Sequence, residues 1–68
     1  MKTVKGKKYK VKIDPCKFFK PGDIVIALEE DRVPFCVLEK DYEPPFKNVG
    51  HYLPSQWNAI KAIYLEEV

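Results

Sequence analysis

The 68-residue chain has only one arginine, one histidine and one tryptophan, and its three glycines are scattered. It therefore lacks a glycine-rich phosphate loop, and it has neither an H-E-x-x-H motif nor the C-x-x-C spacing that many zinc sites use. Its longest uninterrupted apolar run, residues 24–28, is far shorter than the ~20 residues of a membrane-spanning helix. No apolar stretch follows the N-terminal lysines, as a secretory signal would require. These absences predict no metal, no cofactor, no membrane span and a cytoplasmic location.

The composition nevertheless predicts a folded domain. Hydrophobic residues make up 46% of the chain and aromatic residues 13%, which is too apolar for a disordered tail. A chain this short buries only about 60% of its surface on folding, which leaves room for one small core. We expect a single domain over residues 1–68, with residues 1–6 as a flexible basic N-terminus.

The charges are distributed unevenly along the chain. Residues 1–20 contain eight lysines and one acidic residue, whereas residues 21–68 contain four basic and nine acidic residues. This asymmetry favours two halves that fold against each other and largely neutralise their charges. The alternative is that the N-terminal lysines contact an acidic partner such as nucleic acid.

Alternation of apolar and polar residues predicts the first strands. In residues 7–13, Tyr9, Val11 and Ile13 alternate with lysines, which is typical of a half-buried strand. Residues 24–29 are apolar on both faces and predict a central strand. The intervening Pro21-Gly22 pair suits a type II turn.

The patterns after residue 34 are less regular than those of the first two strands. We expect strands at residues 35–39 and 49–53, a 3₁₀ turn at 54–57 and a closing strand at 59–65. Residues 59–65 also fit a short helix, but their β-branched content favours a strand. Five short strands in a chain of this length predict a small closed or nearly closed barrel.

Two stretches carry a resemblance to a known family. In residues 18–29, F-F-K-P-G-D leads into an apolar strand, and residues 50–57 read G-H-Y-L-P-S-Q-W. Both resemble the Src-homology-3 (SH3) domain, where a diverging turn enters the second strand and a P-S-N-Y run forms a 3₁₀ turn. The resemblance implies an all-β, five-stranded SH3-like barrel with one 3₁₀ turn before the last strand. A looser resemblance to short proteins of bacterial mobile elements, many from prophages, implies a host or element-encoded partner.

The predicted function is that of a small, non-enzymatic module that binds a protein. Rigid aromatic side chains dominate interface hot spots, and the SH3 resemblance makes Pro54 and Trp57 part of a ligand-binding shelf. The expected surface lies between the 3₁₀ turn and the loops at residues 29–34 and 40–48. Its candidate residues are Trp57, Pro54, Tyr52, Phe35, Tyr42 and Phe46. The family's A-L-Y-D-Y segment and paired tryptophans are absent here, which argues against recognition of proline-rich motifs.

The alternative is non-specific nucleic-acid binding, in the manner of the small Tudor and KOW barrels. Five lysines of the N-terminal strand region would contact phosphates: Lys5, Lys7, Lys8, Lys10 and Lys12. The lone Arg32 limits bidentate contacts to phosphate or guanine, so we expect no sequence specificity.

Catalysis is the least favoured function. A nucleophile drawn from Cys16, Cys36 or Ser55 would have to pair with His51, and no third residue is placed to orient that pair. We therefore predict that the protein is not an enzyme. Both cysteines are expected to be buried or half-buried free thiols, with a disulfide as the alternative in an oxidising compartment.

Overall fold

The structure is a computed structural model that describes residues 1–43, 50, 52–53 and 55–68. Within these ranges the chain forms five strands, two 3₁₀ turns and no α-helix. The elements are β1 (Lys8–Val11), β2 (Ile24–Ala27), β3 (Phe35–Leu38), η1 (Glu39–Asp41), β4 (Trp57–Ala59), η3 (Ala62–Tyr64) and β5 (Leu65–Glu67). The predicted all-β fold class is confirmed.

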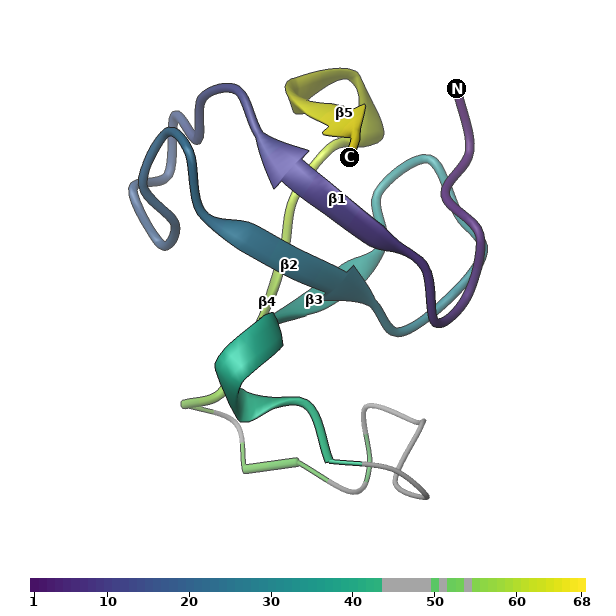
Figure 1. Ribbon diagram of the computed structural model, residues 1–68, viewed down its shortest axis with the longest axis vertical. Coiled ribbons are helices and arrows are strands. Elements are labelled where there is room, and N and C mark those ends of the chain that lie inside the picture. The colour runs from purple at the N-terminus through teal and green to yellow at the C-terminus, as the bar shows by residue number, and fades with distance from the viewer. Residues whose placement is uncertain (44–49, 51, 54) are drawn as a thin grey trace.

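The strands form one open antiparallel sheet in the order β4-β3-β2-β1-β5. β2 is the central strand, as its apolar residues on both faces predict. β5 returns beside β1, with Leu65 opposite Val11. Figure 1 shows the two chain ends at the same end of the molecule, with η1 at the other.

Because strand side chains alternate between two faces, β2 and β3 contribute to an apolar cluster on each side of the sheet. The larger cluster is the main core, with Val25 and Cys36 fully buried in it. Its buried members are Tyr9, Val11, Phe19, Val25, Ala27, Cys36, Ile60 and Leu65. The second we call the aromatic cluster; it consists of Ile26, Leu28, Val37 and Tyr52 with the partly buried Phe35, Tyr42 and Trp57.

The N-terminal half largely matches the strand prediction. Tyr9 and Val11 are buried, but Ile13 is 54% exposed because β1 ends at Val11. The predicted turn before β2 is confirmed. The N–H of Asp23 donates to the carbonyl of Lys20 (3.0 Å), and Gly22 has a φ of 93°. A left-handed residue at the third position is what a type II turn requires.

The C-terminal part differs from the prediction. The described residues of the expected strand at 49–53, Gly50, Tyr52 and Leu53, are not in a strand; Val49 and His51 lie outside the described residues. The N–H of Leu53 donates to Oε1 of Gln56, and the N–H of Gln56 donates to the carbonyl of Leu53, both at 2.8 Å. These bonds form a turn instead.

The predicted closing strand at 59–65 is also wrong. β4 ends at Ala59, and η3 separates it from β5. Ala62 is fully buried, and its N–H donates to the carbonyl of Arg32 at 2.7 Å. This long-range contact favours a 3₁₀ turn here. The 3₁₀ turn before the last strand therefore lies at residues 62–64, and Trp57 belongs to β4.

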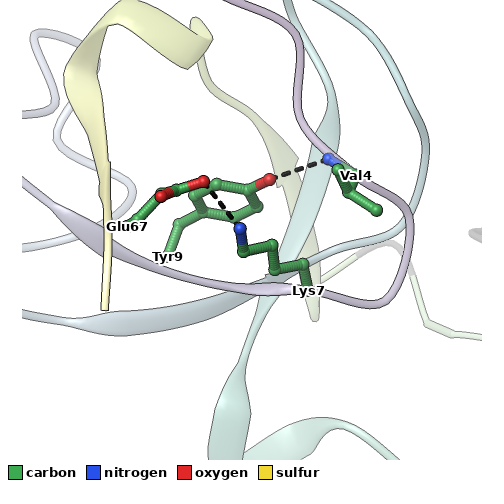
Figure 2. Close-up of polar contacts among 4 residues, drawn as sticks. All are labelled: Val4, Lys7, Tyr9 and Glu67. Carbon is green, nitrogen blue, oxygen red and sulfur yellow. Dashed lines mark hydrogen bonds and ion pairs between the residues drawn. The ribbon is translucent and has the colours of Figure 1, made fainter.

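The first residues do not form the free tail that the sequence predicted for residues 1–6. Thr3 is only 1% exposed, and its N–H donates to the carbonyl of Asp31 at 3.0 Å. The N–H of Val4 donates to the hydroxyl of Tyr9 at 2.8 Å (Figure 2). These contacts attach the N-terminal segment to β1 and to the loop after β2.

Candidate functional site

Three separate segments enclose a groove of about 350 Å³. They are the loop between β1 and β2, the loop between β2 and β3, and the stretch from the end of β4 through η3. The lining residues are Asp14, Pro15, Cys16, Val33, Ala59, Ile60, Lys61 and Tyr64. Most of these side chains are apolar, so the groove suits an apolar group with a few polar contacts at its edge.

Backbone hydrogen bonds hold these segments together. The N–H of Ile60 donates to the carbonyl of Pro34 at 3.1 Å, one residue from Val33. The N–H of Lys12 donates to the carbonyl of Tyr64 at 2.8 Å, which fixes the start of the β1–β2 loop against η3. Because hydrogen bonds already hold the backbone of the groove in place, less conformational entropy is lost when a ligand binds.

Asp14 organises the wall that the β1–β2 loop contributes. Its side chain is buried and accepts hydrogen bonds from the backbone N–H groups of Cys16, Phe18 and Phe19, each at 3.0 Å. Phe19 is 4% exposed and packs in the main core, so it anchors the loop. The carboxylate thus gives three backbone N–H groups of the loop a hydrogen-bond acceptor.

Four exposed large apolar side chains lie on the same three segments. Ile13 and Phe18 belong to the β1–β2 loop, Val33 to the β2–β3 loop and Ile63 to η3, and each is between 45% and 60% exposed. Of the four, Val33 lines the groove itself, and exposed apolar surface at a concavity is typical of interaction sites.

The aromatic residues predicted as the partner surface gather elsewhere. Phe35 and Trp57 make an edge-to-face contact with ring centroids 4.6 Å apart, and Tyr42 stacks on Tyr52 at 6.4 Å. The indole Nε1–H of Trp57 donates to the carbonyl of Tyr52 at 3.1 Å.

Tyr52 is buried and Phe35, Tyr42 and Trp57 are half-buried. All four belong to the aromatic cluster, and none of them lines the groove. Phe46 and Pro54 lie outside the described residues.

Lys7 and Lys8, which were predicted to contact nucleic acid, form ion pairs with described residues. Lys7 Nζ lies 2.6 Å from Oε1 of Glu67 (Figure 2), and Lys8 Nζ lies 2.6 Å from Oε2 of Glu39. The hydrogen bond with Glu67 raises the pKa of Lys7, and the same bond lowers the pKa of Glu67. Both pairs join the basic first twenty residues to acids of the remainder. They involve two of the eight lysines of that segment, so extensive neutralisation stays a prediction.

The other candidate lysines lie on the surface. Lys5, Lys10 and Lys12 are exposed. On β1, Lys10 lies opposite Glu66 of β5 in the ladder.

The two cysteines are free thiols in different environments. Burial, with a smaller contribution from Glu29, raises the pKa of Cys36 to about 12, so its thiol is protonated and unreactive at neutral pH. Cys16 is exposed at the groove, which differs from the expected half-buried position.

Within the described ranges, no group of three His, Cys, Asp or Glu side chains is arranged to hold a metal ion, and no helix is long and apolar enough to cross a membrane. His51 lies outside those ranges.

The sequence interpretation missed most of the groove. It named no role for Pro15, Ile60, Lys61 or Tyr64, and it included Val33 only within the loop at residues 29–34. One signal was available: Ile13, Phe18 and Val33 are apolar residues outside the strands, where turn sequences are usually polar. The remaining residues come from distant parts of the chain that only the fold brings together.

Comparisons with protein-family models, curated proteins and solved structures found no match for this chain.

Proposed function

We propose that the protein is a small binding module whose groove docks a short segment of a partner protein. The observation that carries this proposal is the apolar lining of the groove by Pro15, Val33, Ile60 and Tyr64. The segments that build the groove also carry further exposed apolar side chains. Moving such surface out of water on binding is favourable by about 25 cal/mol for each Å².

The dimensions of the groove suit a peptide side chain. Its volume of about 350 Å³ is at the lower end of the range for ligand sites, which is roughly 300–1,000 Å³. It fits one or two side chains of an extended segment, and the hydrogen-bonded walls keep the site formed before the ligand arrives.

An SH3-like fold is part of the same proposal. The turn at residues 20–23 leads directly into β2, and a 3₁₀ turn immediately precedes the last strand, as in the family that residues 18–29 resemble. The resemblance to mobile-element proteins makes a host or element-encoded protein the expected partner. The cytoplasmic location remains a prediction from the sequence.

Selection from a displayed library of random peptides tests this function. The wild-type protein should enrich a related set of peptides, and Val33→Glu should weaken their binding more than ten-fold because it places a charge in the apolar groove. Leu53→Glu is the matched control, since Leu53 is also exposed and does not line the groove. Equal binding by both variants, or no enrichment, would contradict the proposal.

Nucleic-acid binding remains the second candidate, favoured by the exposed Lys10 and Lys12 on and beside β1. Each phosphate that a lysine neutralises releases counterions, so affinity for a DNA or RNA oligonucleotide should fall steeply with salt. A fluorescence-anisotropy titration at two salt concentrations measures this directly. Absence of binding at low salt would remove this candidate.

A further inference from the structure

The chemistry around the groove indicates which peptides it would accept, an inference that rests on the proposed function. Each of the three segments that build the groove carries an exposed cation: Lys17, Arg32 and Lys61. We call these three residues the basic rim. Lys61 itself lines the groove, while Lys17 and Arg32 directly follow and precede the lining residues Cys16 and Val33. None of the three forms an ion pair with a described residue.

Most carboxylates of the same loops already accept hydrogen bonds from the backbone. The carboxylate of Asp14 accepts three such bonds. Oδ1 of Asp31 accepts from the N–H groups of Arg32 (2.6 Å) and Val33 (3.3 Å), and Oε1 of Glu29 accepts from the N–H of Phe35 (3.0 Å).

Oδ2 of Asp23 accepts from the N–H of Lys20 at 2.9 Å. Glu30 is the one described acid of these loops with no such bond. The loop backbone thus already uses at least one oxygen of four of these five carboxylates, whereas none of the three cations of the basic rim is ion-paired with a described acid.

Lys17 provides a second, independent observation. It is the one non-glycine residue with a positive φ, 61°, among the residues that the structure describes. A side chain in this region costs conformational energy that glycine avoids. Such strain often persists where the side chain serves a function, and here the strained residue carries a cation beside the groove.

We propose that the groove binds an acidic peptide segment in which one large apolar side chain is flanked by aspartate or glutamate. The apolar side chain enters between Pro15, Val33 and Ile60, and the flanking carboxylates accept hydrogen bonds from the basic rim. Charge-assisted bonds of this kind are stronger than neutral ones and fix the register of the ligand. A basic peptide would instead meet the like charges of the basic rim.

The peptides selected by the wild-type protein provide the first test. They should be enriched in Asp and Glu beside an apolar position. Replacing the acids of the best peptide by Asn and Gln should weaken its binding, and added salt should weaken the acidic form more than the amide form. Selected peptides that are neutral or basic would overturn this inference while leaving the proposed function intact.

Charge variants of the protein provide the second test. Lys61→Gln and Arg32→Gln should each reduce affinity for the acidic peptide roughly five-fold, the size expected for an exposed ion pair. Lys40→Gln is the matched control, because Lys40 is exposed in η1, at the opposite end of the molecule from β5 (Figure 1). Equal loss in all three variants would overturn the inference, because it would indicate a general effect of charge.

The variant Lys17→Gly distinguishes an effect on peptide affinity from an effect on protein stability. Glycine relieves the positive φ, so the midpoint of urea unfolding should stay the same or rise, while affinity for the acidic peptide falls. Unchanged affinity would overturn the role of Lys17.

A random-sequence DNA oligonucleotide supplies the last comparison. If it competes for the groove as strongly as the acidic peptide does, the basic rim recognises any polyanion and the peptide inference is wrong.

Discussion

At the level of single residues, Asp14 supplies the hydrogen bonds that a strand partner would otherwise give to the start of the β1–β2 loop. Its three backbone donors, Cys16, Phe18 and Phe19, lie within five residues of it. One short side chain therefore determines the shape of one wall of the groove.

Replacing Asp14 by alanine should lower the free energy of unfolding by about 3 kcal/mol, because buried N–H groups lose their acceptor. Asp14→Asn, which keeps one oxygen acceptor, should show an intermediate loss. The measurement is urea unfolding followed by the fluorescence of Trp57, the only tryptophan. Wild-type stability in the alanine variant would show that the loop is held by other contacts.

The two thiols should react very differently. At pH 8 an alkylating reagent should modify Cys16, which is exposed, and leave Cys36 unmodified because its pKa is raised to about 12. Mass spectrometry of the native and the urea-unfolded protein measures this, with both cysteines labelled after unfolding. Above pH 9 the unfolded chain ionises Cys36 and the folded chain does not, so stability should fall as the pH rises. Rapid native labelling of Cys36 would contradict this prediction.

At the level of elements, the turn into β2 depends on one glycine. Gly22 has a φ of 93°, and a Cβ built there meets no atom within 4 Å. Gly22→Ala should therefore destabilise the protein by about 1–2 kcal/mol through backbone strain alone. Gly50→Ala is the control, since that position has neither a positive φ nor a close neighbour. Equal unfolding midpoints for the two variants would contradict the argument.

The elements that could be predicted are those whose pattern is local. Alternation with lysines around Tyr9 predicted β1, and the apolar run at residues 24–29 predicted β2. The expected strand at residues 35–39 corresponds to β3. The region after residue 58 was misassigned because Ala59, Ala62 and Leu65 fit either period. The position of η3 depends on Ala62, which is buried and whose N–H donates to the carbonyl of the distant Arg32.

At the level of the whole molecule, two ion pairs connect the basic first twenty residues with acids from distant parts of the chain. Lys7 pairs with Glu67 across the two ends, and Lys8 pairs with Glu39. The charge distribution alone led us to expect contacts between the two halves. The groove could not be predicted in the same way, because its walls meet only when β4, η3 and two loops are in place.

The Lys7–Glu67 pair should contribute to stability only between two pH limits. The pKa of Glu67 is lowered from 4.5, so its contribution is present above that pH and is lost as the pH falls through the folded-state value. The pKa of Lys7 is raised from 10.5, so its contribution is lost as the pH rises through its folded-state value.

The difference in unfolding midpoint between wild type and Glu67→Gln should therefore be greatest near neutral pH and shrink in acid and in strong base. Both side chains are exposed, so the difference should be small. Glu30→Gln is the control, and an identical pH profile for the two variants would refute the effect of the pair.

The attachment of the first residues has a practical consequence for handling the protein. Thr3 donates to the Asp31 carbonyl, and Oδ1 of Asp31 accepts from the N–H of Val33. An affinity tag or surface linker fused ahead of Met1 would therefore lie two residues from a segment that is hydrogen-bonded to the loop carrying Val33. Val68 is 75% exposed and lies outside β5, so immobilisation through the C-terminal residue is the better choice for binding measurements.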